Sequence, residues 1–186
     1  MIYVLIAVLA VVVLALLFFV LTYNRLIRVR NACQNAWAQV DVQLKRRHDL
    51  IPNLIESVKA YSSHESDLFE NIAETRSKSM TTDGIPAKGA VENELSGQLK
   101  TLLAIAEAYP DLKASANFLS LQKGLVEIED QIQYARRYYN ATVRDYNIRV
   151  QSFPGVLFAK LFGFQQAEFF EIEFATEREA PDAKFE

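Results

Sequence analysis

The chain has 186 residues, with Lys+Arg 20, Asp+Glu 23 and a formal net charge of -3 at pH 7. This slight acidic excess argues against a nucleic-acid-binding protein, which usually carries a clear basic excess. One cysteine, Cys33, and two histidines, His48 and His64, exclude an intramolecular disulfide framework and a thiolate cluster, and leave few groups for a metal or acid–base centre.

Residues 1–21 contain no charged side chain and form an uninterrupted apolar run. An apolar helix of roughly 20 residues spans a hydrocarbon core about 30 Å thick. A cleaved signal peptide normally has a basic start and a small-residue cleavage site, whereas no Lys or Arg precedes this run and Tyr23-Asn24-Arg25 follows it. A buried core helix would not be apolar on every face. The pattern favours a retained transmembrane anchor over residues 1–22.

Basic residues lie on one side of this span only. Arg25, Arg28 and Arg30 follow it closely, and none comes before it. The positive-inside rule therefore predicts that the N-terminus lies outside and the rest of the chain in the cytoplasm. A free thiol at Cys33 agrees with a reducing compartment.

After the anchor, apolar side chains recur in steps of three and four, which is typical of a helix with one buried face. His48 falls in phase with this stripe and is expected to face inward. Pro52 removes a backbone donor and is expected to kink or break the helix near residues 48–50, leaving either one bent helix or two. The stripe comprises Leu26, Val29, Cys33, Trp37, Val40, Leu44, Ile51, Ile55, Val58, Tyr61, Leu68 and Ile72.

Residues 77–93 contain Gly, Pro and Thr in a pattern that predicts a loop. A second helix is expected over about residues 91–109, ended by Pro110, with Asp111 or Ser115 able to cap the next one. A third amphipathic helix runs to Val150 and is stopped by residues 153–155. Without an alternating strand pattern, the sequence predicts an all-α fold: a single N-terminal transmembrane helix, then an antiparallel, up-and-down bundle of about four long helices over residues 23–174.

The segment 153–174 is rich in phenylalanine and predicts a short apolar helix ended by Gly163. The favoured interpretation is an aromatic cap on the bundle. The alternative is an exposed patch that binds a partner or the membrane, with Phe158 and Phe162 as candidate interface residues. An up-down-up path would place this end away from the anchor, which argues against contact with lipid. The polar tail, residues 175–186, is expected to be disordered.

The sequence contains no motif for phosphate binding, acyl transfer, zinc hydrolysis or dithiol chemistry. We therefore predict no catalytic, cofactor-binding or metal-ligating residue, no cofactor, no small-molecule substrate and no nucleic-acid partner. Scattered carboxylates are typical of solvated helix faces. The least favoured function is an unrecognised hydrolase or metal enzyme, which would require several carboxylates to come together with a histidine. The candidate residues are Glu107, Glu127, Glu129 and Asp130 with His64.

Four polar residues surround the predicted helix break at Pro52: Arg46, Arg47, Asp49 and Asn53. One interpretation is structural, with Arg47 or Asn53 donating to backbone carbonyls that Pro52 leaves without a partner. The other is an interface built on arginine–carboxylate pairs, formed by Arg46, Arg47 and Asp49. The residues alone leave both open.

The stretch AWAQVDVQLKRRHDLIPNLIESVKAY, followed by LLAIAEAYPDLKASAN and by NFLSLQKGLVEIEDQIQYARRYYNATVRDYN, resembles the LemA family. The resemblance covers about residues 23–170. It is specific, because the matching run of residues is long and unusual. Cys33 and His48 depart from it. The matching positions are Trp37, Asp41, Arg46, Arg47, Asp49, Pro52, Asn53, Tyr109, Pro110, Asp111 and Asn140.

This resemblance implies a bacterial protein anchored in the inner membrane by its N-terminus, with a cytoplasmic bundle of long helices and no established reaction. The leading hypothesis is a non-enzymatic scaffold or adaptor that self-associates and contacts other membrane proteins. The alternative is a regulatory partner of a membrane protease or an envelope-stress system.

Overall fold

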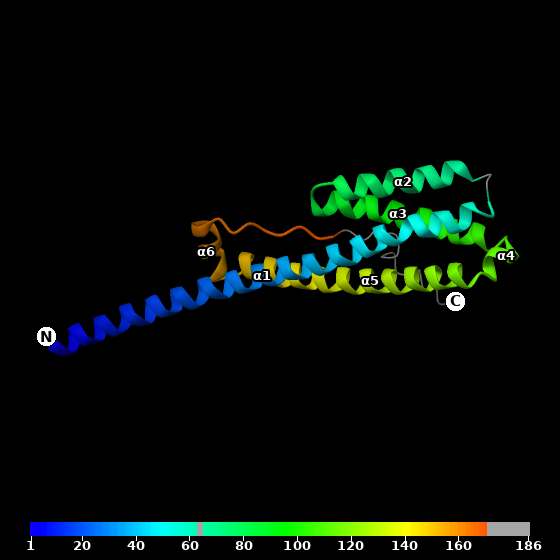
Figure 1. Cartoon of the computed structure of the whole chain (residues 1–186). Helices are drawn as coiled ribbons and strands as arrows, with labels where there is room; N and C mark the ends of the chain where they lie inside the picture. Colours follow the sequence, from blue (N-terminus) through cyan, green and yellow to red (C-terminus); the bar gives the residue numbers. More distant parts are fainter. Residues whose placement is uncertain (63–64, 171–186) are drawn as a thin grey trace, which may run out of the picture. The chain divides into compact units, whose positions relative to one another are not determined.

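The computed structural model describes residues 1–62 and 65–170. These residues form six helices: α1 (Ile2–Lys59), α2 (Ser66–Thr81), α3 (Ile85–Ala106), α4 (Pro110–Lys113), α5 (Ala116–Gln151) and α6 (Gly155–Phe162) (Figure 1). Within the described ranges there is no strand, so the all-α prediction is confirmed. The predicted tail 175–186 and His64 lie outside the described residues.

The first helix contains the predicted anchor. Within the described part of the chain, α1 is the one helix that is long and apolar enough to cross a membrane. Its N-terminal part has a mean hydropathy of 3.5, and none of that part is buried against the rest of the protein. An apolar helical segment whose side chains stay exposed is suited to lipid. The structure therefore contains a helix with the properties of a membrane anchor.

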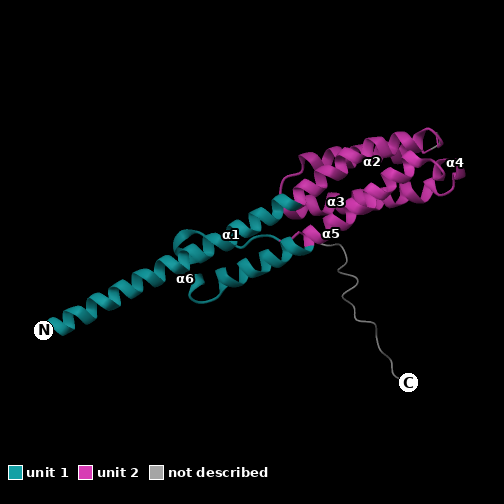
Figure 2. Ribbon diagram, turned by 60° about the horizontal axis from the view of Figure 1, so that its bottom comes forward, with its two compact units in different colours: residues 1–39, 137–168 teal, residues 40–136, 169–186 magenta. Residues whose placement is uncertain are grey.

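The chain divides into two compact units, which Figure 2 colours separately. Unit 1 contains residues 1–39 and 137–168, and unit 2 contains residues 40–136 and the segment from Phe169. Each unit has its own buried apolar residues, because α1 and α5 contribute one part of their length to each.

In unit 1, the first part of α1 lies beside the end of α5, and α6 folds back onto α1. The ring centroids of Trp37 and Tyr139 are 5.4 Å apart, while those of Phe19 and Phe158 are 4.9 Å apart. The two helices are therefore antiparallel, with α6 at the anchor end. Buried residues here include Leu26, Cys33, Ala36, Val143, Tyr146, Val150 and Phe164.

An extended segment after α6 returns along α5. Asn147 binds it through two hydrogen bonds, since its Nδ2 donates to the Ala167 carbonyl (2.9 Å) and its Oδ1 accepts from the Ala167 amide (2.8 Å). The Tyr146 hydroxyl donates to the Gln165 carbonyl at 2.8 Å, and that of Tyr139 donates to the Glu168 carbonyl at 2.7 Å. Burial, together with nearby Cys33 and Glu168, raises the pKa of Tyr139 to about 12.

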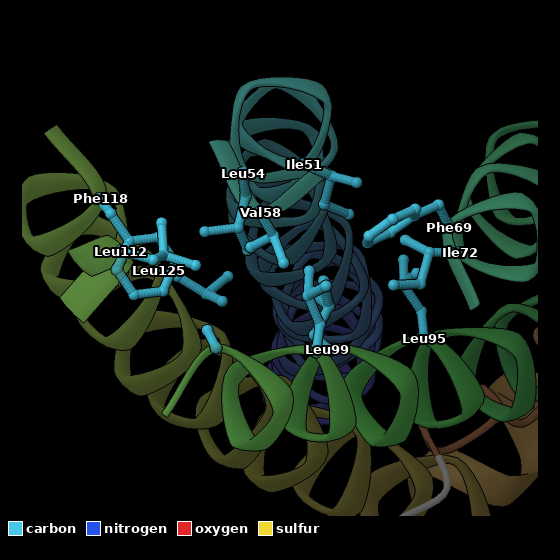
Figure 3. Packing of buried hydrophobic residues seen from close by; sticks show 12 residues of the cluster. Ile51, Leu54, Val58, Phe69, Ile72, Leu95, Leu99, Leu112, Phe118 and Leu125 are labelled. Atoms are coloured by element: carbon cyan, nitrogen blue, oxygen red, sulfur yellow. The ribbon is translucent and has the colours of Figure 1, made fainter. Parts of the chain in front are cut away.

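In unit 2, the second part of α1 packs with α2, α3, α4 and the first part of α5. Figure 3 shows side chains of α1 directed between Phe69 and Ile72 of α2 on one side and Leu112 and Leu125 on the other. The core consists of Ile51, Leu54, Val58, Phe69, Ile72, Leu95, Leu99, Leu102, Ala106, Leu112, Phe118 and Leu125. Most of the predicted stripe is thus buried. Ile55 is an exception, because it is only partly buried while its neighbour Leu54 is fully buried.

Helix boundaries differ from the predictions at two places. The predicted loop at residues 77–93 is wrong, because α2 continues to Thr81 and α3 begins at Ile85. Gly84 supplies the turn with φ +86, and Pro86 occupies the first turn of α3, where its missing N–H needs no helical partner. The Gly and Pro signals therefore marked a tight turn and a helix start.

The other difference lies where the first stripe was expected to continue. α1 does not end at Pro52, which lies inside it, but at Lys59, and α2 begins at Ser66. Because of this additional break, one more helix runs along the bundle than was predicted. As a result, α5 runs back towards the start of the chain. The expectation that the Phe-rich end lies away from the anchor is consequently wrong. By contrast, α5 and α6 end as predicted, with Gly163 at φ +70 closing α6, and Ser115 caps α5.

Candidate functional site

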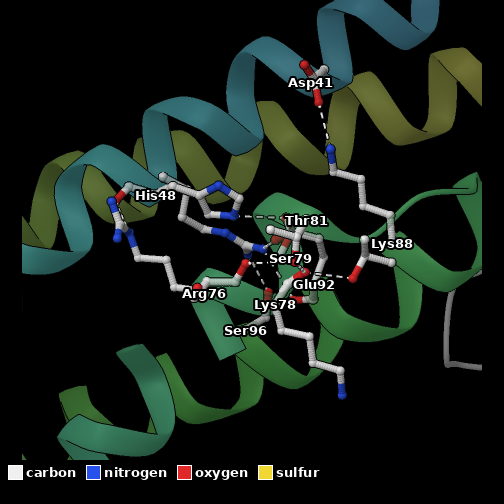
Figure 4. A network of polar contacts seen from close by, with 12 residues as sticks. Asp41, His48, Arg76, Lys78, Ser79, Thr81, Lys88, Glu92 and Ser96 are labelled. Carbon is white, nitrogen blue, oxygen red and sulfur yellow. Dashed lines mark hydrogen bonds and ion pairs between the residues drawn. The ribbon is translucent and has the colours of Figure 1, made fainter. Parts of the chain in front are cut away.

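The side chain of Arg47 is fully enclosed in unit 2, with a relative exposure of 1%. Its guanidinium donates to Ser96 Oγ at 2.6 Å, to Glu129 Oε1 at 2.6 Å and to the Glu92 carbonyl at 3.2 Å. It also forms an ion pair with the carboxylate of Glu92, a residue that Figure 4 shows close to His48, Ser79 and Ser96. One side chain of α1 thus binds α3 through three groups and α5 through Glu129.

Glu92 of α3 is the second centre of this network. Its Oε1 lies 2.9 Å from His48 Nε2 and accepts a hydrogen bond from the Ser79 hydroxyl of α2. Burial would raise the pKa of this carboxyl, but the hydrogen bond with His48, the charge of Arg47 and the Ser79 hydroxyl outweigh it and lower the pKa to about 2. The carboxylate is therefore held in its charged form.

The network joins four helical segments. Residues of α1 (Arg47 and His48), α2 (Ser79), α3 (Glu92 and Ser96) and α5 (Glu129) each contribute a polar group. Buried polar groups are costly unless they are hydrogen-bonded. Because each member is bound to another helix, the arrangement specifies how the helices of unit 2 pair. The prediction that His48 faces inward is confirmed.

A second buried arginine lies nearby in the same unit. Arg136 Nη2 donates to Asn93 Oδ1 at 2.6 Å, and its guanidinium carbon lies 4.3 Å from the centroid of the Phe170 ring. Burial and the charge of Arg47, opposed by Glu129 and Glu92, lower the pKa of Arg136 to about 10. Its cation–π contact ties the extended C-terminal segment to α5.

Arg76 of α2 compensates for the missing donor of Pro52. The helical partner of the Pro52 nitrogen would be the carbonyl four residues earlier, which is that of His48. Arg76 Nε donates to this carbonyl at 2.7 Å. The sequence suggested Arg47 or Asn53 as donors. Instead, Arg47 forms ion pairs with Glu92 and Glu129, and Asn53 is exposed. This explains why α1 continues through a proline.

We expect Arg76→Leu to destabilise the protein by about 1–3 kcal/mol, because it leaves the His48 carbonyl without a partner. In a Pro52→Ala background the same change should cost less, since the alanine restores the helical N–H. Thermal unfolding of the full chain in detergent, followed by circular dichroism, measures both. Lys78→Leu, an exposed change on the same helix, is the control. Equal costs of Arg76→Leu in the two backgrounds would contradict this assignment.

Two predicted interface residues, Arg46 and Asp49, lie at the surface of unit 2. They line a groove of about 730 Å³ between α1 and α5. Both signs of charge are present in it, and Gly124 leaves its α5 side open, with nothing within 4 Å of the position of a Cβ. The remaining lining residues are Gln43, Leu50, Glu127, Ile128, Asp130 and Gln131.

The structure separates the other predicted site residues. Arg47 is buried in the network, whereas Phe158 is buried against α1 and Phe162 is 45% exposed on α6. In the described ranges, no group of three or more His, Cys, Asp or Glu is arranged to hold a metal ion. Glu127 and Asp130 instead line the groove, and Glu129 binds Arg47.

Sequence reasoning missed the partners of Arg47. Glu92 and Ser79 fell within the segment predicted as a loop, and Arg76 and Arg136 carried no motif. The available signal was the helical spacing of Glu92 and Ser96, one turn apart beside Leu95 and Leu99. Glu92 is in helical phase with Leu95 and Leu99, which places it on the buried side of the second predicted helix.

Several known proteins are similar to this chain in sequence. The model of the LemA family matches residues 36–185. Magnetosome protein MamQ of Magnetospirillum gryphiswaldense is 26% identical, with 87% of this chain and 71% of that protein aligned. Magnetosome protein MamQ 2 of Paramagnetospirillum magneticum is 25% identical over 89% of this chain and 72% of its own length. Protein LemA of Metamycoplasma hominis is 29% identical over 74% and 68%, respectively.

Proposed function

This chain belongs to the LemA family, and on that premise we propose that it is a non-enzymatic, membrane-anchored helical scaffold that self-associates at the bacterial inner membrane. The apolar part of α1 supports anchoring, because it is long enough to span a bilayer and is unburied. Arg25, Arg28 and Arg30 follow the apolar part and favour a cytoplasmic position for the helical units.

The buried polar residues support a structural rather than a catalytic role. Arg47 and His48 are enclosed and each contacts the Glu92 carboxylate, so these contacts hold α1 and α3 together. A catalytic acid or base needs contact with a substrate. Neither carboxylate partner of Arg47 lines the large groove of unit 2.

The observation that carries the proposal of self-association is the groove between α1 and α5. It contains Arg46 together with Asp49, Glu127 and Asp130, so Arg46 of each copy could pair with Glu127 of the other. A contact of this kind between identical surfaces is the usual geometry of a dimer. Val42 and Val126, one residue before the lining residues Gln43 and Glu127, are exposed apolar side chains that such a contact would cover.

The test is co-purification of two differently tagged full-length copies, extracted gently from membranes, together with the native mass. We expect a discrete homo-oligomer for the natural chain. Arg46→Glu should reduce co-purification, because it places like charges together, and adding Glu127→Arg should restore it. Arg144→Glu, an exposed change on α5 outside the groove, is the matched control.

A monomer would contradict the proposed self-association. An oligomer that Arg46→Glu leaves intact would contradict the assignment of the groove. A stoichiometric complex with another membrane protein would favour the alternative, in which this chain regulates that partner.

A further inference from the structure

The short helix α6 packs against the end of the apolar span. The ring centroid of Phe158 lies 4.9 Å from that of Phe19, and the Phe162 ring lies 5.8 Å from Phe19 and 4.9 Å from Tyr23. Phe19 belongs to the apolar run itself, which ends two residues later at Leu21. A helix in contact with Phe19 therefore lies at the depth where an inserted span would leave the hydrocarbon core.

The opposite side of this element is apolar and uncovered. Phe153, Leu157 and Leu161 have relative exposures of 78%, 58% and 70%. They are four residues apart, and Leu157 and Leu161 share one face of α6. Phe158 and Ala159 meanwhile bury the other side against the protein. The element is thus apolar towards the anchor and apolar towards its surroundings.

Basic side chains lie beside this apolar surface. Lys160 is exposed on α6, one residue before Leu161. A cavity of about 280 Å³ next to the start of α6 is lined by Arg25 and Arg149 together with Phe18 and Phe153. Cations beside an apolar surface at the edge of a span are the combination that binds anionic headgroups and the acyl chains below them. Guanidinium groups are also well suited to phosphate.

From these contacts we infer that α6 lies in the headgroup layer of the membrane. Phe153, Leu157 and Leu161 enter the acyl-chain boundary, and anionic phospholipid headgroups bind at Arg25, Arg149 and Lys160. The occupant of the apolar surface is the lipid bilayer, because the contact with Phe19 places α6 at the bilayer's edge. This inference rests on the proposed anchoring by α1 and adds a second membrane contact to it.

The experiment places an environment-sensitive fluorophore at Leu161→Cys in full-length protein carrying Cys33→Ala. The protein is reconstituted into vesicles of phosphatidylcholine with and without phosphatidylglycerol, containing lipids with a nitroxide quencher on the upper part of the acyl chain. We expect blue-shifted emission and a loss of fluorescence approaching that of a label at Leu14→Cys within the span. Tyr138→Cys, an exposed aromatic on α5 next to the Trp37 contact of Tyr139, should be unquenched.

The outcomes separate the inference from the proposed function. Quenching at Leu14→Cys without quenching at Leu161→Cys overturns the inference and leaves the anchor standing. Absence of quenching at both positions overturns both. A blue shift at Leu161→Cys without quenching also overturns it, because the surface is then covered by protein.

The lipid composition tests the role of the basic residues. We expect quenching at Leu161→Cys to be stronger with phosphatidylglycerol than without it, and Arg25→Ala with Arg149→Ala to remove that difference. Equal quenching in the two vesicle types would overturn the assignment of anionic headgroups to the cavity.

Discussion

Replacing Arg47 with alanine is expected to lower the free energy of unfolding of the chain by about 3–5 kcal/mol, the usual cost of breaking a buried ion pair from one side. The change removes the partner of Glu92, whose carboxylate stays enclosed, and also leaves Ser96 and Glu129 without their donor. Thermal and chemical unfolding of the full-length protein in detergent, followed by circular dichroism, measures this loss.

The adjacent arginine provides the matched control. Arg46 is exposed and donates a 3.4 Å hydrogen bond to the side chain of Gln43, so Arg46→Ala should change stability by less than about 0.5 kcal/mol. Arg47→Met combined with Glu92→Leu should cost less than Arg47→Ala, because both charges are then replaced by apolar groups of similar size. Similar losses for Arg46→Ala and Arg47→Ala would contradict the structural role of the network.

Acidification is expected to destabilise the protein through Glu92. Its pKa is lowered from 4.5 to about 2 in the folded chain. A carboxyl with a lowered folded-state pKa contributes stability that is fully present above pH 4.5 and is lost as the pH falls towards 2. A shift of this size corresponds to on the order of 3 kcal/mol. Unfolding free energies measured from pH 6 to pH 2 test the prediction.

Two variants separate Glu92 from the other acidic residues. Glu92→Gln should be less stable at neutral pH but should lose less stability than the natural chain between pH 4.5 and 2. Glu94→Gln, an exposed change on the same helix, should leave the pH profile unchanged. A profile for Glu92→Gln as steep as that of the natural chain would assign the acid sensitivity to another group.

Much of the helical architecture follows from local sequence. The charge-free run, the long stripe of α5 and the glycine after α6 each act within a few residues, so their structural consequences are predictable. The break between α1 and α2 was not, because Leu68 and Ile72 continue the spacing of the α1 stripe across it. The predicted length of the turn between α2 and α3 was too great, because Gly84 and Pro86 are compatible both with a long loop and with the start of a helix.

The site illustrates a different limit. Arg47 stood out from its sequence neighbours, yet whether it was buried depended on Glu92 and Glu129, which lie 45 and 82 residues away. Pairing over such separations is set by tertiary packing and leaves no periodic signal. Pro52 likewise marked a backbone defect, but its compensation by Arg76 required the position of α2. The sequence indicated that a backbone carbonyl near Pro52 needs a hydrogen-bond donor, but it did not indicate which residue donates.

The continuity of α1 has a mechanical consequence for an anchored protein. No linker separates the apolar run from the stem that follows it, since one helix extends from Ile2 to Lys59. A bilayer thinner than the span is accommodated by tilting the helix. That tilt is carried at least through the stem of unit 1 to Gln39, and one added residue at Thr22 would turn this stem by about 100° about its axis. Bilayer thickness is in this way converted into an angle of the stem that follows the span.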